Sequence, residues 1–189
     1  MTKIKVITAS TRPGRFGDQP TKWVLELAKD YPQATFELVD LKDIALPFLD
    51  EPEPAMGGTY TKEHTKQWAK MIDEADGFII VTPEYNHSYP ASLKNAIDFL
   101  WKEWNYKPVA FVSYGSHAGG ARAVEHLRGV APQVKLFSLH EQVVIGSYWS
   151  YLDENGTFTP SNGHTKDLQA LLGEITFWSE KLKPIRLEK

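Results

Sequence analysis

The feature that most constrains the fold is a regular alternation of short apolar segments with longer segments of helical periodicity. The short segments are rich in β-formers and span residues 3–9, 35–41, 77–83, 108–114 and 135–139 or slightly beyond. Those at 3–9, 77–83 and 108–114 carry few charges toward their C-terminal ends. Such runs are typical of strands that are covered on both faces of a parallel sheet.

The longer segments read as helices at residues 18–29, 61–75, 90–104, 120–130 and 165–182. The segments at 18–29, 61–75, 90–104 and 165–182 place their large apolar side chains on one face at helical spacing, and the segment at 120–130 follows the fourth strand. Strands that alternate with helices form right-handed crossovers and a doubly wound α/β sheet. We therefore predict one domain over residues 1–189, with a five-stranded parallel sheet in the flavodoxin-like order 2-1-3-4-5.

Composition excludes several classes of protein. The chain has no cysteine, which excludes a disulfide scaffold, a thiolate nucleophile and a cysteine-held cluster, so redox chemistry needs a borrowed cofactor. Its six histidines show no zinc spacing, and we expect no metal site. With 21 basic and 24 acidic residues the net charge is −3, which argues against a general nucleic-acid binder.

Nothing in the sequence predicts a membrane or export segment. The start of the chain lacks the long apolar stretch of a signal peptide. The longest apolar runs, such as residues 78–81, are far shorter than the ~20 residues of a membrane helix. We expect a cytoplasmic protein with no membrane partner.

Ligands of open parallel sheets bind beyond the carboxyl ends of the strands, where the strand order reverses. The segment that follows the strand at 3–9 contains Ser10, Arg12, Arg15 and Gly17 and leads into a helix. Hydroxyls, guanidiniums, flexible backbone and a helix N-terminus together suit a phosphate monoester. The alternative is a solvated loop that happens to hold two arginines.

The segment that follows the strand at 77–83 is bounded by Pro83 and Pro90 and presents a run of polar and aromatic residues. A planar heterocycle could stack there and bond to backbone amides around Asn86. The alternative is a capped turn whose polar side chains only satisfy the backbone.

The segment after the strand at 108–114 is rich in glycine, which lets the backbone approach a flat ligand. Ser116 and His117 suggest a hydrolase, but a nucleophile elbow needs glycine where Tyr114 stands. Adjacent Ser and His seldom act as nucleophile and base, so hydrolysis is disfavoured. A turn that needs positive φ is the remaining alternative.

Two connections, 42–60 and 146–162, are longer than average, and each is either functional or a tolerated insertion. We hypothesise that Trp149 lines a subunit interface or an acceptor pocket. The run Asp153-Glu-Asn-Gly156 predicts a hairpin turn between short accessory strands.

Taken in order, these three ligand segments resemble the NADPH-dependent FMN reductase family, which includes flavodoxin-like quinone, azo-dye and chromate reductases. The resemblance covers nearly the whole chain. It is carried by residues 10–15, by 83–98 (Pro-Glu-Tyr-Asn-His-Ser-Tyr-Pro-Ala-Ser-Leu-Lys-Asn-Ala-Ile-Asp), and by Ser113-Tyr-Gly with Gly119-Gly-Ala-Arg122.

The resemblance implies an enzyme in which FMN takes hydride from NADPH or NADH and passes electrons to a small-molecule acceptor. Quinones, azo dyes, metal oxyanions and free flavin all stay open as acceptors. It implies a homodimer or a dimer of dimers, and no catalytic side chain, because the cofactor carries the reaction. The implied FMN ligands are Ser10, Arg12, Arg15 and Gly17 for the phosphate, and Pro83, Glu84, Tyr85, Asn86, Ser113, Gly115 and Ser116 for the ring.

The sequence departs from the family at three places: Ala9-Ser10 replaces a common Gly-Ser, Arg15 replaces a small hydroxyl residue, and Ser116-His117 replaces a second glycine. His117 either approaches the flavin edge or faces solvent. A rival reading is a flavodoxin-type electron carrier, although such carriers are strongly acidic. A receiver domain would need an acidic cluster after the strand at 3–9, where the chain has Thr8-Ala-Ser10.

Overall fold

The fold is built on five parallel strands, in a computed structural model that describes residues 1–188. The strands are β1 (Thr2–Thr8), β2 (Ala34–Asp40), β3 (Gly77–Pro83), β4 (Pro108–Tyr114) and β5 (Phe137–Ile145). They pair in the order β2-β1-β3-β4-β5, which confirms the predicted topology.

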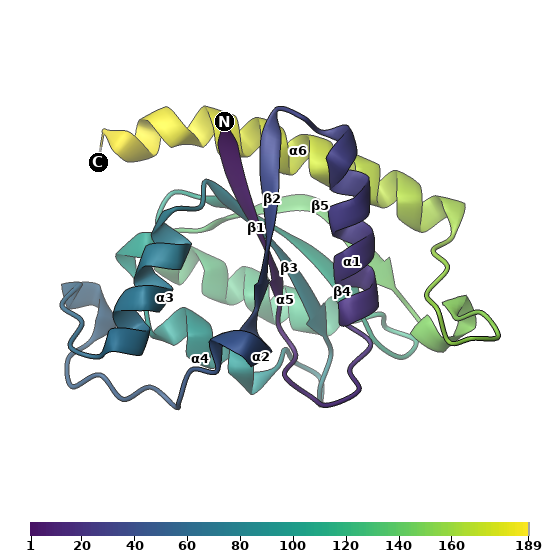
Figure 1. The fold of residues 1–189 in the computed structure, drawn as a ribbon, viewed down its shortest axis with the longest axis horizontal. Helices are drawn as coiled ribbons and strands as arrows, with labels where there is room; N and C mark the ends of the chain where they lie inside the picture. The colour runs from purple at the N-terminus through teal and green to yellow at the C-terminus, as the bar shows by residue number, and fades with distance from the viewer. Residues whose placement is uncertain (189) are drawn as a thin grey trace.

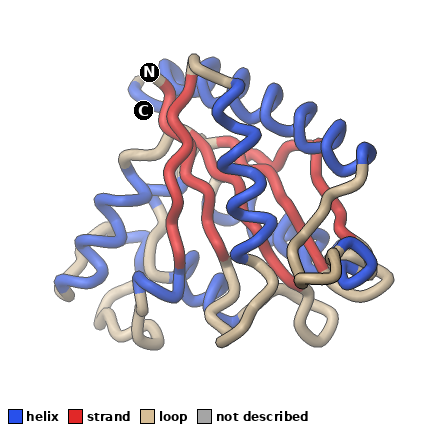
Figure 2. Tube along the Cα trace, turned by 45° about the vertical axis from the view of Figure 1, so that its right-hand side comes forward, coloured by secondary structure: helices blue, strands red, loops and turns tan. Residues whose placement is uncertain are grey.

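Helices cover both faces of this sheet (Figures 1 and 2). They are α1 (Asp18–Leu27), α2 (Leu41–Ile44), α3 (Glu63–Asp73), α4 (Ala91–Asp98), α5 (Ala121–Val130) and α6 (Asn162–Leu187). Short 3-10 segments span Ala28–Asp30, Ala55–Gly57, Lys102–Trp104, Ala131–Val134 and Tyr148–Tyr151. No helix among residues 1–188 has the length and apolar content to span a membrane.

Each face of the sheet has its own apolar core. One core joins the sheet to α3, α4 and α5 through side chains such as Trp68, Leu93 and Leu127. The other joins the opposite face to α1 and α6 through Val24 and Leu171 among others. Because both faces are dry, β3 and β4 are buried along their whole length, as their apolar composition predicts.

Three predicted elements differ from the structure by more than two residues at an end. The expected helix at 90–104 ends at Asp98, because Trp101 has a non-helical backbone and the chain turns before a 3-10 segment. The fifth strand starts later and runs to Ile145, since Lys135 adopts a left-handed conformation and a register irregularity places residues 139–141 opposite the single residue Ala110 of β4. α6 is longer at both ends than the predicted 165–182 and begins at a capping box on Ser161.

The predicted turn at 153–156 is confirmed, but the flanking strands reduce to one antiparallel bridge between Leu152 and Phe158. Helix α2 was not predicted. It spans a single turn, too short for an apolar periodicity, and its N-cap is Asp40, whose side chain accepts from the Lys42 N–H.

Candidate functional site

The three predicted ligand segments meet at the carboxyl edge of the sheet (Figure 2). Backbone hydrogen bonds join them. The Ala9 N–H donates to Val81 in β3, and the Glu84 N–H donates to Tyr114 at the end of β4. The sheet order therefore brings together residues 10–17, 83–88 and 113–120, as the topology predicts.

The segment at 10–17 presents unpaired donors at the start of α1. Within the described part of the chain, the backbone N–H groups of Gly14, Phe16 and Gly17 have no protein acceptor. Gly14 has φ +65°, and nothing lies near the position of a side chain there. Arg12 is exposed beside these groups. Free amides, a helix N-terminus and an exposed cation are the groups that proteins use to bind anions.

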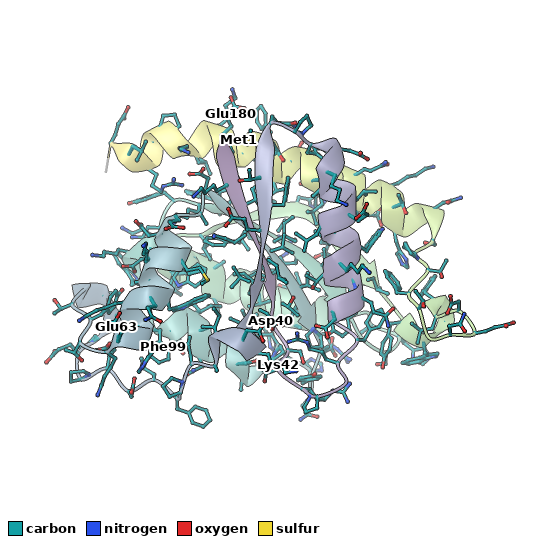
Figure 3. All side chains as sticks on the ribbon, viewed as in Figure 1. Met1, Asp40, Lys42, Glu63, Phe99 and Glu180 are labelled. Atoms are coloured by element: carbon teal, nitrogen blue, oxygen red, sulfur yellow. The ribbon has the colours of Figure 1, made fainter. Side chains whose placement is uncertain are left out.

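Arg15, which the sequence assigned to phosphate, is committed elsewhere. Its buried guanidinium lies between two carboxylates: it donates at 2.7 Å to Asp40 and, through Nε, at 2.6 Å to Asp18, and it also contacts the Ser10 carbonyl. The hydrogen bond to Asp40 is the main reason that the pKa of Arg15 rises. Figure 3 shows Asp40 at the end of β2. Arg15 thus ties the 10–17 segment to β2.

The same contact acts on Asp40. Burial opposes the ionisation of this carboxyl, but hydrogen bonds from Arg15 and from the Lys42 N–H outweigh it and lower the pKa of Asp40. The pair is therefore fully ionised at neutral pH. Its charge is balanced within the protein, so Arg12 is the cation of this segment that stays available.

Residues 85–88 form a tight two-residue turn. The Tyr85 N–H donates to Ser88 at 2.8 Å, and the Ser88 N–H donates back at 3.1 Å. Asn86 and His87 have φ of +49° and +75°, the pattern of a type I′ turn. Positive φ at His87 costs energy that the surrounding structure must offset, and such residues cluster at functional sites.

A side-chain hydrogen bond joins the 85–88 turn to the 10–17 segment. Ser10 is buried, and its Oγ lies 2.7 Å from the Tyr85 hydroxyl. Pro83 is the buried last residue of β3, and Asn86 is exposed. The contact between Ser10 and Tyr85 therefore holds the two segments at a fixed distance from each other.

The third segment closes the opposite side. A Cβ at Gly115 would lie 3.1 Å from the Gly120 nitrogen, a tight contact, so glycine suits the close packing of this segment. Ser116 and His117 are exposed. Ser113, in contrast, is fully buried with its Oγ toward the Val143 carbonyl at 3.4 Å, so its side chain faces β5.

Two residues at this edge were missed by sequence reasoning. Asp40 is the partner of Arg15. Its position at the end of β2, which shares this edge, is the sequence feature that could have identified it. The Tyr114 hydroxyl is buried without a partner in residues 1–188, and burial raises its pKa. A side chain on Gly17 would come within 2.6 Å of that hydroxyl, so Tyr114 supports the start of α1 from beneath.

The side chain of Glu84, which the family resemblance assigns to the flavin ring, points inward rather than toward a ligand. Its side chain is buried and forms an ion pair with Arg122 of α5, while its second carboxylate oxygen has no partner in the described residues. The pair links the start of the 84–88 turn to α5 and leaves the turn backbone, rather than this carboxylate, as the exposed surface.

The connection after β5 packs against two ligand segments. Tyr148 stacks on Phe16 with ring centroids 4.4 Å apart, and Trp149 lies edge-on to His117 at 6.4 Å. The Ser147 N–H donates to the Ser116 carbonyl at 2.8 Å. Trp149 is half exposed at this edge. Whether it serves an interface or an acceptor stays a prediction.

The residues present fit FMN. Unpaired amides and Arg12 at the start of α1 suit a phosphate monoester, and the glycine backbone at 115–120 opposite the 85–88 turn suits a flat ring. Where metals are concerned, residues 1–188 contain no cluster of three or more His, Cys, Asp or Glu that could hold an ion.

Comparison with known proteins gives a consistent result. The family model for NADPH-dependent FMN reductase matches residues 2–150. An NAD(P)H-dependent FMN reductase of Schizosaccharomyces pombe is 41% identical over 92% of this chain and 88% of its own. A quinone reductase of Escherichia coli is 30% identical over 98% of both chains. Among solved structures, the flavoenzyme NAD(P)H:(acceptor) oxidoreductase FerB of Paracoccus denitrificans has a TM-score of 0.75 at 24% identity, covering 96% of this chain and 99% of the other.

Proposed function

The chain belongs to the NADPH-dependent FMN reductase family, and from this premise we propose that it is a single-domain oxidoreductase that carries electrons from NAD(P)H to a quinone-type acceptor. The observation that carries the proposal is the set of unpaired N–H groups beside Arg12 at the start of α1. This set matches the one charged group of FMN.

The chain's own residues divide the work of binding. Arg12 and the backbone N–H groups of Gly14, Phe16 and Gly17 hold the phosphate. Arg15 and Ser10 hold the shape of that segment through Asp40 and Tyr85. The backbone of Pro83, Glu84, Tyr85 and Asn86 carries one side of the ring, and Gly115 and Ser116 border the other. Ser113 supports the border from within β4.

FMN, when bound, would supply the two-electron chemistry between NAD(P)H and the acceptor. The protein orients the two ligands in turn at one site and needs no nucleophile. The rigid 85–88 turn is suited to this task, because its paired hydrogen bonds hold the exposed Asn86 backbone in one conformation.

A flavodoxin-type carrier remains the alternative function. Two observations favour the enzyme. The curated relatives that match most of the chain are named as reductases. The segment at the start of α1 also carries the exposed Arg12, where a strongly acidic carrier would have no arginine.

The assembly and location follow the family resemblance. We infer a homodimer or a dimer of dimers in the cytoplasm. The exposed side chains of Phe48, Leu49 and Met56 in the long 42–60 connection support an interface between copies, since large apolar groups gathered on one loop favour burial.

The test compares two flavins that differ only in the phosphate. Purified apoprotein should bind FMN at least about tenfold more tightly than riboflavin, because one charge-assisted contact set is worth about 1.4 kcal/mol or more. Quenching of flavin fluorescence measures both dissociation constants. Equal affinity for the two flavins would contradict the assigned phosphate site.

A further inference from the structure

Helix α5 is packed against a proposed flavin-binding segment, and its exposed face has no role so far. The helix follows Gly120, the last residue of the 113–120 segment. A Cβ at Gly120 would come within 2.8 Å of the Ser113 Cβ and 3.0 Å of the Tyr114 backbone, so the start of the helix lies directly against the end of β4. α5 therefore begins at a fixed position beside the proposed ring site.

Two side chains of α5 contact the 85–88 turn at its two ends. Arg122 forms an ion pair with the carboxylate of Glu84, which directly precedes the turn. His126 lies one helical turn further on, and its Nδ1 is 2.9 Å from the Oγ of Ser88, the last residue of the turn. Residues four positions apart share one face of a helix, so a single face of α5 holds both ends of the turn.

The contact of His126 with the turn involves two residues. In residues 1–188 the Ser88 hydroxyl has no other partner at hydrogen-bond distance. The ring of His87 also lies beside the ring of His126, with centroids 6.0 Å apart. Because both imidazoles are exposed, this arrangement buries little apolar surface, and its effect is on the conformation of the turn.

The tip of this turn carries unpaired donors. Tyr85 and Ser88 exchange backbone hydrogen bonds, but in the described part of the chain the N–H groups of Asn86 and His87 have no protein acceptor. Asn86 and His87 both have positive φ, a conformation that residues other than glycine seldom adopt without support from their surroundings. A turn that lost this support would relax, and the direction of its two free N–H groups would change.

Free N–H donors distinguish the two redox states of a flavin. The oxidised ring has only hydrogen-bond acceptors at N5 and O4, whereas the two-electron reduced ring carries a hydrogen on N5. Donors that are held in one direction therefore favour the oxidised ring. Hydrogen bonds to ring nitrogens are one means by which a protein sets the potential of its cofactor.

We propose that His126 is a positioning residue which, through Ser88, holds the free donors of the 85–88 turn toward the flavin ring and lowers the reduction potential of bound FMN. The ion pair between Arg122 and Glu84 fixes the other end of the turn. The proposal rests on the proposed function. His126 takes no part in the transfer of electrons or protons and acts on the flavin only through the turn.

The experiment measures the two-electron midpoint potential of FMN bound to the protein, by reduction with dithionite against a reference dye. His126→Ala should weaken binding of oxidised FMN about threefold, as expected for one hydrogen bond, and leave the affinity for reduced FMN unchanged. The potential should then rise by about 14 mV, which is a threefold change converted at about 30 mV per factor of ten. A general loss of packing would weaken both redox states equally and leave the potential unchanged.

Three further variants sharpen the result. Ser88→Ala should raise the potential by the same amount, and its combination with His126→Ala should produce no further rise, because both changes remove the same contact. His126→Asn, whose amide replaces the hydrogen-bonding group at Nδ1, should restore the potential of the unmodified protein. His140→Ala removes an exposed histidine of β5 and is the matched control, which should leave the potential unchanged.

The outcomes separate this inference from the proposed function. An unchanged or lower potential in His126→Ala and Ser88→Ala would overturn the positioning role, even if NADPH reduces the bound flavin. Because dithionite replaces NADPH in the measurement, a rise in potential would support the positioning role even in a protein that NADPH fails to reduce. An unmodified protein that binds no FMN would overturn both.

Discussion

The two edges of the sheet each hold a buried charge cluster, and the clusters are built in opposite ways. At the carboxyl edge one cation, Arg15, lies between the acids Asp18 and Asp40. At the amino edge one acid, Asp76, lies between the cations Lys183 and Arg186 and accepts from the Lys3 N–H at 2.9 Å.

The difference shows what each edge does. The Asp76 carboxylate is fully paired: burial opposes ionisation of this carboxyl, but its three donors outweigh that and lower its pKa. It anchors the end of α6 to the first strand. The Arg15 cluster shapes a segment whose neighbouring amides and Arg12 stay unpaired. At the amino edge the buried carboxylate is therefore fully paired within the protein, while the carboxyl edge leaves backbone donors and Arg12 for a ligand.

The largest changes in unfolding free energy should come from substitutions that remove the central charge of either cluster. Arg15→Met leaves the largely buried Asp40 without its charged partner, and Asp76→Asn leaves Lys183 and Arg186 without theirs, so each should lower the unfolding free energy by about 3 kcal/mol. The variants should differ in FMN affinity: Arg15→Met should weaken it at least about tenfold, and Asp76→Asn should leave it within about twofold. Urea unfolding and flavin fluorescence measure the two quantities. Equal losses of affinity would remove the distinction between the edges.

A buried lysine at the amino edge predicts that the unfolding free energy depends on pH. Lys107 is buried, with its ammonium donating to the Ile72 and Asp73 carbonyls at the end of α3. Burial lowers the pKa of Lys107 to about 7. Between this value and the unfolded pKa of about 10.4, the unfolded chain binds one more proton than the folded protein, so stability should rise with pH.

We expect that rise to be on the order of 2 kcal/mol between pH 7 and 10, measured by urea unfolding. Lys107→Met should flatten it. A wild-type protein whose stability falls steadily over this interval would show that Lys107 stays charged in the fold.

At the carboxyl edge, Arg12 is expected to act through the ligand alone. Arg12→Ala should lower FMN affinity about tenfold and leave riboflavin affinity and stability nearly unchanged, because the side chain is exposed. Lys22→Ala, at an exposed position of α1, is the control. If Arg12→Ala weakened both flavins equally, Arg12 would not contact the phosphate.

The smallest expected effect concerns backbone strain. His87 has a positive φ in a type I′ turn, for which Asn-Gly is preferred, so His87→Gly should raise the unfolding free energy by about 0.5 kcal/mol. Tyr106 also has a positive φ, but its ring contacts the Lys135 ammonium at the amino edge. Tyr106→Gly should therefore destabilise the protein, and thermal unfolding distinguishes the two signs.

Much of this fold could be predicted because its elements carry strong local signals. The bounds predicted for the buried strands at 77–83 and 108–114 match the structure to the residue, because an apolar run of about seven residues is too short for a buried helix and fits a strand covered on both faces. The order of the strands followed from the βαβ alternation. The carboxyl-edge site followed from the order.

The errors fall where long-range contacts decide. The helix at 90–104 keeps an apolar period to Trp104, yet the chain turns after Asp98 and buries Trp104 from a 3-10 segment. Arg15 looked like a phosphate ligand because its partner, Asp40, is 25 positions away. No local sequence pattern shows that the Arg15 guanidinium is already paired with the Asp40 carboxylate.

The central claim is that this chain moves electrons from NAD(P)H through bound FMN. The direct measurement is anaerobic addition of NADPH to the FMN-loaded protein while its visible absorption is recorded. We predict stoichiometric bleaching of the oxidised flavin bands, followed by their full return when 1,4-naphthoquinone is added. Bands that persist with excess NADPH and with excess NADH would contradict the account and favour an electron carrier.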